Sequence, residues 1–410
     1  MMRTTVLAAA LTVMVAAAAC GGDEIRGSGP ITTVDRSQAK LTAPTEPIGP
    51  TIKLGAVTSL TGANTFPEPT AAAQAVFDEV NAAGGIAGHR LELVVADDQN
   101  TIEGARAAAR QLVEQEQVLA IVGGGSVVDC LANADYYAAQ AILNLAGVAA
   151  CGPNAPNVAS MNTGPHLGAM MTMSYLIEQR GVEKLCYSAL NMDIATVFRD
   201  VYLPVWEQVT GHRVHSLIFT DPGADLTPAV IKAAADGCDG VMLVFTEPDY
   251  IRYAELAEAQ GLLDGDIQYA MLTSGYDDTV LRDLGPLGEG WITNSEFLPY
   301  TEAGDTSADL AEFKRVLKVA GLEETSFAQG GYLAARATVQ ALGAVQGGYT
   351  RDSVSAALRA MDYRTELLGG PARWVPYEGA NQLNASSKIV QIRNERFVTI
   401  TDWVSWPPAR

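Results

Sequence analysis

The stretch Val118-Leu-Ala-Ile-Val-Gly-Gly-Gly-Ser-Val-Val-Asp129 decides the fold of this chain. Residues 118–122 form a short apolar run with several β-branched side chains, which is typical of a strand buried on both faces. Gly123-Gly124-Gly125-Ser126 ends the strand, and a helical pattern begins at about Val128. A strand, a glycine-rich turn and a helix start can together bind a ligand, because the glycines expose backbone N–H groups and the helix N-terminus attracts an anion. A purely structural turn between strand and helix is the alternative.

Strands and helices alternate on both sides of this stretch. The pattern predicts strands at residues 52–58, 90–96 and 142–145, with amphipathic helices between them. The alternation pauses after Cys151 and restarts with four further helix–strand pairs between residues 167 and 272. Such alternation is typical of parallel βαβ units. We therefore expect an α/β protein with two doubly wound, Rossmann-like lobes joined by several crossings that form a hinge.

The last part of the chain departs from this alternation. Three helices are predicted at residues 308–320, 327–345 and 351–361, without strands between them, and we expect them to pack back on the first lobe. Residues 388–393 and 396–401 read as a β-hairpin around Asn394-Glu395. The predicted boundaries are residues 51–165 plus 298–371 for lobe 1, and residues 166–297 plus 372–410 for lobe 2.

The N-terminus has the pattern of a bacterial lipoprotein signal peptide at residues 1–20. Arg3 precedes an apolar segment, and Ala17-Ala18-Ala19-Cys20 resembles a lipobox, although its usual leucine is absent. Cys20 would be the lipidated residue; an ordinary secretory signal is the alternative. Residues 21–50 are rich in Gly, Pro, Ser and Thr and read as a flexible linker. We expect export and a lipid anchor on the outer face of the cytoplasmic membrane, the periplasmic side of the cell envelope.

Composition and motifs exclude several classes of function. The chain has 410 residues and a formal net charge of -20, which argues against a nucleic-acid partner. The four histidines show no metal-ligand spacing, so no metal and no cofactor are expected. No Gly-Lys-Ser/Thr follows the glycine turn, so it is not a phosphate-binding loop. It is not a nucleophile elbow either, because no glycine stands two residues after Ser126.

Four further cysteines make disulfides possible in an exported protein. Four cysteines allow three pairings. The order of the predicted elements favours Cys130 with Cys151 in one lobe and Cys186 with Cys238 in the other. Four buried free thiols are the alternative.

Three motifs resemble the leucine/isoleucine/valine-binding protein family, the extracellular solute-binding proteins of ABC importers. They are the first strand and loop at residues 52–62, the first-helix end Phe77-Asp78-Glu79-Val80-Asn81-Ala82-Ala83-Gly84-Gly85-Ile86, and Ala96-Asp97-Asp98-Gln99. The resemblance covers roughly residues 51–398. It implies a type I periplasmic-binding-protein fold with three crossings that closes around its ligand.

The resemblance also implies a set of ligand-binding residues. In the first lobe, Ser126 in its glycine turn matches the serine that holds a ligand carboxylate, and an aromatic near Phe66 packs on the ligand. In the second lobe, the expected residues follow three successive strands. The full set of expected ligand-binding residues is Phe66, Gly125, Ser126, Ala149, Ala150, Asn191, Phe245, Thr246, Glu247, Ser274 and Tyr276.

One departure concerns the ligand ammonium group. The amino-acid binders of the family pair it with an acidic residue after the last of these second-lobe strands, but Ser274-Gly275-Tyr276 contains no carboxylate. Glu247, which ends the neighbouring strand, is the expected substitute. An acid before Pro248 is also a common helix start, so the role of Glu247 stays open.

The sequence thus predicts a monomeric binding protein and not an enzyme. It would capture a small polar solute, such as an amino acid, an amide or a small carboxylate, and deliver it to an ABC-transporter permease in the cytoplasmic membrane. A ligand-sensing module that signals through a membrane partner is the alternative. A serine hydrolase built on Ser126 is excluded, because no histidine follows a predicted strand end nearby.

Overall fold

The computed structural model describes residues 49–62, 64–151, 155–263, 265–302, 306–374 and 383–407. The predicted signal peptide, the lipidation site Cys20 and nearly all of the predicted linker lie outside the described residues. Among the residues that are described, no helix combines the length and apolar character that crossing a bilayer requires.

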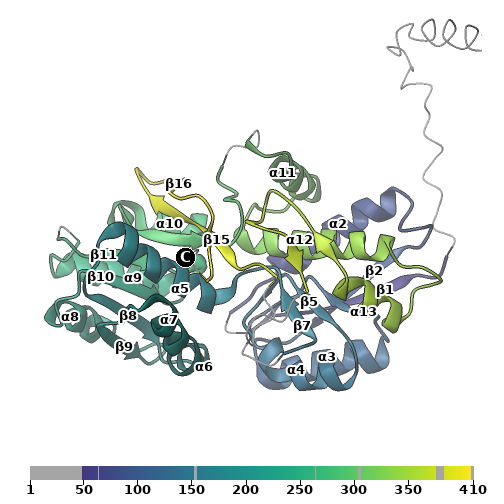
Figure 1. The fold of residues 1–410 in the computed structure, drawn as a ribbon, viewed down its shortest axis with the longest axis horizontal. Helices are drawn as coiled ribbons and strands as arrows, with labels where there is room; N and C mark the ends of the chain where they lie inside the picture. Colours follow the sequence, from purple (N-terminus) through teal and green to yellow (C-terminus); the bar gives the residue numbers. More distant parts are fainter. Residues whose placement is uncertain are drawn as a thin grey trace, which may run out of the picture. The chain divides into compact units, whose positions relative to one another are not determined.

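The first lobe is built on a five-stranded parallel sheet (Figure 1). In spatial order its strands are β2 (Leu91–Asp97), β1 (Ile52–Thr58), β3 (Ile121–Val122), β5 (Asn144–Ala146) and β7 (Val158–Ser160). Side chains alternate between the two faces. Leu54 therefore packs with Phe77 of α2 (Glu68–Ala82), whereas Val57 packs on the other face with residues from α3 (Ile102–Arg110) and α4 (Asp129–Ala139).

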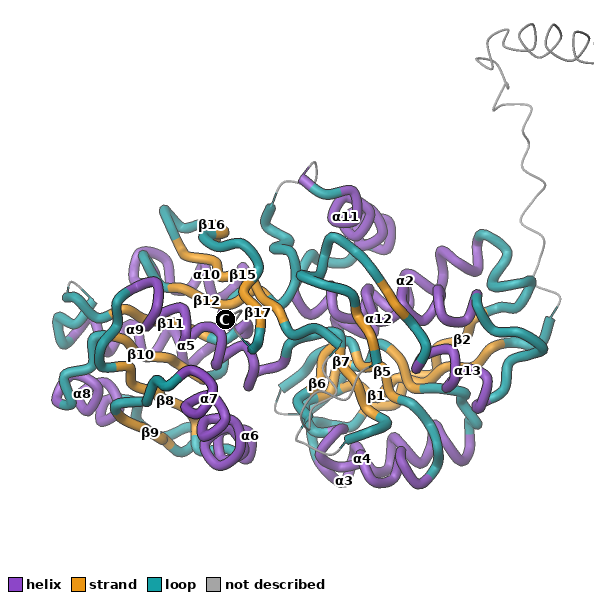
Figure 2. The backbone as a smooth tube through the Cα atoms, in the orientation of Figure 1, coloured by secondary structure: helices purple, strands orange, loops and turns teal. Residues whose placement is uncertain are grey.

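The second lobe is built on a larger mixed sheet, whose strands Figure 2 shows in orange. Its spatial order is β16 (Phe397–Thr399), β15 (Ser386–Ile392), β12 (Ile292–Ser295), β11 (Gln268–Met271), β10 (Gly240–Val244), β8 (Leu185–Leu190) and β9 (Ser216–Thr220), with β17 (Val404–Ser405) paired to β15. The strands from β9 to β12 are parallel, and β15 joins them antiparallel.

In the described residues, six α-helices and one π-helical segment complete the α/β pattern of this lobe. They are α5 (Gly164–Arg180), α6 (Asp193–Val197), a π-helical segment at Phe198–Tyr202, α7 (Leu203–Thr210), α8 (Thr227–Ala235), α9 (Glu247–Ala259) and α10 (Asp278–Leu284). The sequence did not predict α10 and β12, which are short. Glu247 is the first residue of helix α9.

The C-terminal helices pack as the sequence predicted. Helix α11 (Ala308–Ala320) has the predicted bounds, and α12 (Ser326–Gly343) and α13 (Arg351–Arg359) are close to theirs. Helix α12 packs directly against α2 of the first lobe (Figure 1). The predicted hairpin is also present as β15 and β16, and its turn residues Asn394 and Glu395 have φ of 51° and 54°.

Three chain crossings connect the two sheets. The first runs from β7 to α5, the second follows β12, and the third lies between β14 (Ala372–Arg373), which pairs with β13 (Asp362–Tyr363), and β15. They contact one another: the Leu383 N–H donates to the Ser160 carbonyl at 3.0 Å, and the Asn384 side chain donates to the Glu296 carbonyl at 2.6 Å. The hinge is therefore one hydrogen-bonded unit.

Two disulfides tie helices or loops to neighbouring strands. Cys130 of α4 is bonded to Cys151, and Cys186 of β8 is bonded to Cys238, which precedes β10. The Cα–Cα distances are 5.3 Å and 5.9 Å, within the usual range for disulfides. These are the two pairs that the order of elements favoured.

Candidate functional site

Both sheets have the same strand order, and this order marks where a ligand can bind. Numbered along the chain within each parallel part, the order is 2-1-3-4-5 in both lobes. In such sheets ligands bind beyond the carboxyl ends of the strands, where the order reverses. In the first lobe this point lies between β1 and β3, and in the second between β8 and β10. Gly125, Ser126, Asn191, Thr246 and Glu247 follow these strands.

The glycine-rich turn forms a close-packed backbone crossing. Gly123 has φ of 68°, and a Cβ on Gly124 would lie 2.4 Å from the Val57 carbonyl oxygen. The sequence predicted a plain turn here. In the structure Gly125 and Ser126 instead form a short strand, β4. It pairs in parallel with β6 (Val148–Ala149), which brings Ser126 beside Ala149.

The hydroxyl group of Ser126 is engaged within the protein. It accepts hydrogen bonds from the backbone N–H groups of Val128 at 3.3 Å and Asp129 at 2.9 Å, and it donates its proton to the carboxylate of Asp98. Ser126 is 3% exposed and Asp98 is fully buried. The sequence predicted that this proton would go to a ligand carboxylate. In the structure, the hydroxyl instead donates its hydrogen bond to the carboxylate of Asp98, within the protein.

Sequence reasoning missed the buried polar network next to this serine. The Asp129 carboxylate accepts hydrogen bonds, each 2.7 Å long, from the Asn133 amide, the Tyr137 hydroxyl and the Asn144 amide. Burial raises the pKa of Asp129 to about 6, against the effect of these donors. The acidic pair Asp97-Asp98 at the end of β2 could have indicated this network. In the sequence it served only as part of a family motif.

Phe66 is half-buried and contacts a second aromatic residue. Its ring meets Phe327 of α12 edge-on, with the centroids 5.6 Å apart. Its backbone N–H donates to the Ser59 carbonyl at 2.8 Å, which holds the loop after β1. Phe327 was not among the expected site residues. The sequence pattern placed it only at the start of a predicted helix and gave no reason to connect it with Phe66.

Two of the expected second-lobe residues belong to the core. Phe245 and Tyr276 are 6% and 2% exposed and pack among other aromatic side chains. The Tyr276 hydroxyl is 2.9 Å from the Thr301 hydroxyl. Ala149 and Ala150 are also buried, at 3% and 5% exposure.

The other expected residues of this lobe are more accessible, and their polar atoms have local partners. The exposed Asn191 donates to Asp221 at 2.8 Å, and the Thr246 hydroxyl donates to Asp249 at 2.7 Å. The Ser274 hydroxyl lies 3.0 Å from the Tyr250 hydroxyl. These three side chains help to shape the strand ends.

Acidic residues from the two lobes influence one another electrostatically. Glu247 begins α9 in the second lobe and is half-buried. Burial raises its pKa, and the negative charges of Asp277 and Glu68 raise it further. Glu68 begins α2 in the first lobe, and its pKa is raised by burial and by Asp277 and Glu323. We call Glu68, Glu247 and Asp277 the acidic set.

The acidic set has no cationic partner among the described residues. No Lys or Arg is among the causes of the pKa shifts of Glu68 and Glu247, and Oε2 of Glu68 is buried without a hydrogen-bond partner there. The sequence identified Glu247 but missed Glu68 and Asp277, which lie far away along the chain. Helix-start acids are common, so no sequence signal separated these from the others.

Large apolar side chains are exposed on loops and helix starts near the same strand ends. Leu60 follows β1, Leu131 lies in the first turn of α4, and Met192 follows β8; they are 43%, 45% and 41% exposed. Exposed apolar groups at strand ends are suited to contact an apolar part of a ligand. Within the described residues, no group of His, Cys, Asp and Glu side chains is arranged to hold a metal ion.

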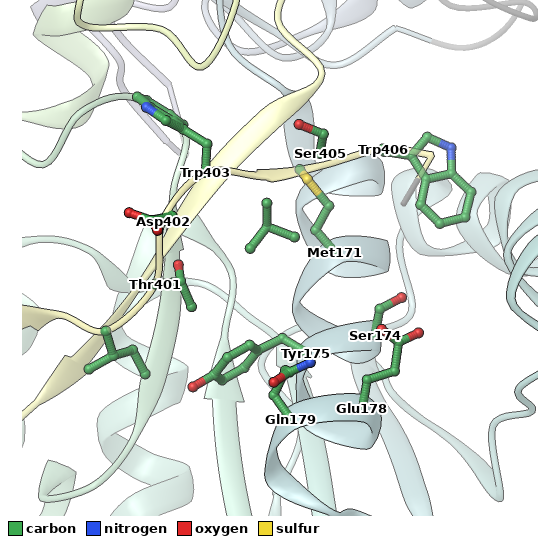
Figure 3. A pocket seen from close by; sticks show the side chains of 12 residues that line it. Met171, Ser174, Tyr175, Glu178, Gln179, Thr401, Asp402, Trp403, Ser405 and Trp406 are labelled. Carbon is green, nitrogen blue, oxygen red and sulfur yellow. The ribbon is translucent and has the colours of Figure 1, made fainter. Parts of the chain in front are cut away.

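Two cavities are lined by residues other than the eleven that the sequence predicted to bind the ligand. One, of about 410 Å³, is an open pocket between α5 and the C-terminal segment (Figure 3), where Tyr175, Glu178 and Trp403 line it. The other, of about 520 Å³, is lined by residues that include Asp277, Tyr300 and Lys314. None of the eleven residues expected to bind the ligand lines either cavity. The second borders the acidic set through Asp277.

Comparisons with known proteins support one family. The family model described as "Periplasmic binding protein" matches residues 51–396. A protein of Pseudomonas aeruginosa named "Amino acid binding protein" is 33% identical over 105 residues, and the match covers 26% of each chain. The chain thus matches only about a quarter of the length of this curated relative.

Solved structures share the fold at low sequence identity. The structure of a possible leucine/isoleucine/valine-binding protein from Rhodopirellula baltica has a TM-score of 0.73 and 16% identity, over 88% of this chain and 98% of that one. A solute-binding protein of an ABC transporter from Rhodopseudomonas palustris, solved with 3,4-dihydroxybenzoic acid, has a TM-score of 0.70 and 17% identity, over 87% and 97%. At such identities the likeness concerns the fold alone.

Proposed function

The chain belongs to the periplasmic binding protein family, and from this premise we propose that it captures a small polar solute between its lobes and delivers it to an ABC-transporter permease. The shared fold supports capture by closure about the hinge, because three crossings join two lobes whose ligand-binding edges carry the expected residues. The similar solved structures include proteins named for amino acids and one that holds an aromatic acid, so the fold leaves the solute open.

Our proposal that the solute bears an amine rests on the acidic set. Glu68, Glu247 and Asp277 come from both lobes and have no cationic partner among the described residues. Partly buried carboxylates without a counter-charge are costly, and a bound ammonium group would offset that cost. Exposed apolar side chains lie near the same strand ends. An amine-bearing solute with an apolar part, such as an amino acid, fits these features best.

The remaining expected residues take two roles in this proposal. Phe66, Gly125, Ser126, Asn191, Thr246 and Ser274 contact the solute or shape the strand ends around it. Phe245, Tyr276, Ala149 and Ala150 act through packing, because they are buried. Since the Ser126 hydroxyl donates to Asp98, a ligand carboxylate at this turn would receive a hydrogen bond from Ser126 only if the hydroxyl turned away from Asp98.

A screen followed by calorimetry tests this proposal. Thermal shifts with amino acids, amides and small carboxylates identify a solute, and calorimetry then compares the wild type with Glu247→Gln and Glu68→Gln. For an amine-bearing solute we expect each variant to lose about tenfold or more in affinity, because the cation loses a charged partner. Glu255→Gln, an exposed change on the same helix as Glu247, should keep the wild-type affinity.

Two outcomes would contradict the proposed solute class. One is unchanged or improved affinity in both acidic-set variants, which a neutral amide or a plain carboxylate would produce. The other is an equal loss in the Glu255→Gln control, which would indicate a general effect of net charge.

The cellular setting is part of the proposal. We propose an exported monomer held by lipid at Cys20 to the outer face of the cytoplasmic membrane, with lobes bounded as the sequence predicts. A ligand-sensing module is the second candidate function, and it would use the same site. A permease gene beside this gene, together with solute uptake that is lost on deletion, would favour transport over sensing.

A further inference from the structure

Glu296 occupies the junction of the three crossings. It follows β12 directly and is fully buried. Its Oε1 accepts three hydrogen bonds from the first crossing: from the Gly164 N–H at 2.9 Å, and from the Thr163 hydroxyl and the Asn162 amide at 3.2 Å each. One oxygen of the second crossing therefore holds three successive residues of the first.

The third crossing is attached to the same residue. The Asn384 amide donates to the Glu296 backbone carbonyl at 2.6 Å, and the Thr163 hydroxyl lies 3.4 Å from the Ser387 hydroxyl. A rotation of one lobe about the hinge changes the relative positions of the crossings. Such a rotation must therefore strain or break hydrogen bonds to Glu296.

The second carboxyl oxygen has no partner. Oε2 of Glu296 is buried and makes no hydrogen bond within the described residues. An ionised carboxylate would leave charge on a buried oxygen without a hydrogen-bond partner, which is costly, whereas a neutral carboxylic acid costs much less. Burial accordingly raises the pKa of Glu296 to about 7, and its hydrogen bonds to the first crossing oppose this only partly.

The groups around this carboxyl are uncharged. From the first crossing they are Asn162 and Thr163, from the third crossing Asn384, and from the start of β15 Ser387. No charged residue is among the causes of the Glu296 shift. His166, two residues into α5 from Gly164, has its pKa lowered to about 4 by burial and is neutral near pH 7. Among the described residues of the crossings, Glu296 is therefore the group whose charge changes near neutral pH.

We propose that the carboxyl group of Glu296 is a pH-sensitive latch of the hinge. In its neutral form it holds the crossings in the arrangement of this structure, and its ionisation loosens the first crossing so that water can reach Oε2. The inference goes beyond the proposed function, because it concerns the protein without solute. It makes the arrangement of the lobes, and hence solute capture, respond to pH around neutrality.

Hydrogen exchange of the full chain without solute tests the latch. Protection of peptides that contain Gly164 is compared at about pH 5.5 and about pH 8.5, after correction for intrinsic rates. In the wild type we expect this protection to fall at least about threefold at the higher pH relative to peptides from β1. In Glu296→Gln, which cannot ionise, the ratio should not change with pH.

Asp129→Asn provides the matched control. Asp129 is also a buried carboxyl with a raised pKa, but its hydrogen-bond partners Asn133, Tyr137 and Asn144 lie in the first lobe and not in a crossing. This variant should keep the wild-type response at Gly164. A wild-type protection that is independent of pH would overturn the latch, and so would a response that persists in Glu296→Gln.

A spectroscopic measurement covers the case in which Glu296→Gln does not fold. Infrared difference spectra of Asp129→Asn between the same two pH values should show loss of a buried carboxylic-acid carbonyl band, with a midpoint between about pH 6 and about pH 8. Absence of that band at about pH 5.5 would mean that Glu296 is already ionised there, and the latch would be wrong. Because no solute is used, neither result depends on the proposed function.

Discussion

At the residue scale, Ser126 illustrates how the structure changes the meaning of a sequence motif. Its hydroxyl oxygen accepts two backbone N–H groups at the start of α4 and donates to the buried carboxylate of Asp98. The first two bonds satisfy N–H groups that a helix start otherwise leaves unpaired. The glycine-rich turn therefore does structural work whether or not it also contacts a solute.

We expect Ser126→Ala to lower the free energy of unfolding by about 1–3 kcal/mol, because it removes a helix cap and leaves a buried carboxylate short of a donor. Denaturant unfolding measures this change. Ser355→Ala is the control, since the Ser355 hydroxyl has no hydrogen-bond partner in the described part of the chain. Equal stability of Ser126→Ala and the wild type would contradict the role assigned to this hydroxyl.

Asp129 makes stability depend on pH. Its pKa is raised from an ordinary 3.8 to about 6, so the folded state binds more protons than the unfolded state between these values. The free energy of unfolding should therefore fall as pH rises through this window, by up to about 3 kcal/mol. Denaturant unfolding at a series of pH values should show a flatter profile for Asp129→Asn.

The exposed Asp135 on the same helix provides the control for this profile. Asp135→Asn removes one acidic group from α4 without touching the buried network, and it should keep the wild-type slope. If Asp129→Asn and the wild type had the same slope between about pH 4 and about pH 6, the assignment of this dependence to Asp129 would be wrong.

At the element scale, the contact of α2 with α12 positions one side of the site. Phe66 and Glu68 lie at the start of α2, and Phe327 lies in the first turn of α12. Gly331 lets the helices approach, because a Cβ there would lie 1.8 Å from the Pro69 carbonyl oxygen. Small residues at a helix crossing thus set the distance between side chains that are near the proposed solute.

Gly331→Ala should lower the free energy of unfolding by about 1–3 kcal/mol or more, because the added methyl group forces the two helices apart. Gly343→Ala, at the end of the same helix, has nothing within 4 Å of the added Cβ. It should leave stability unchanged or raise it by about 0.4–1 kcal/mol. Thermal unfolding of both variants measures this difference in stability. Similar effects at the two positions would contradict the close contact of α12 with α2 at Gly331.

At the scale of the whole molecule, two lobes of the same strand order present their ligand-binding edges to a common hinge. The acidic set combines Glu68 from one lobe with Glu247 and Asp277 from the other, so the proposed solute site would require both lobes. Glu296 then connects the crossings at the centre of the hinge. If the proposed function is right, solute binding and lobe rotation are coupled, because the same two lobes would carry the site and move about the hinge.

Cys20→Ala tests the proposed attachment of this whole body to the membrane. Lipid acylation would supply the apolar anchor, at about 0.8 kcal/mol for each buried CH₂ group. We expect the variant to appear in the soluble fraction or to accumulate as unprocessed precursor, as measured by fractionation and mass spectrometry. A mature-sized variant that stays with the membrane would contradict the lipid anchor.

The sequence by itself determined the α/β class, the two lobes and the ligand-binding family, as well as the pairs of cysteines that it favoured. These follow from local periodicity, from turn residues and from the order of motifs, which short stretches of chain carry on their own. The first strand and α11 were located with their observed bounds for this reason.

Only the tertiary structure decided which polar groups meet. It joined Ser126 to Asp98, brought Glu68 close enough to raise the pKa of Glu247, and placed Glu296 against the first crossing. It also placed Phe245 and Tyr276 in the aromatic core, although their sequence positions matched a site. The physical reason is that a hydrogen bond or a charge interaction depends on distances between residues remote in sequence, and the periodicity of a single segment contains no information on those distances.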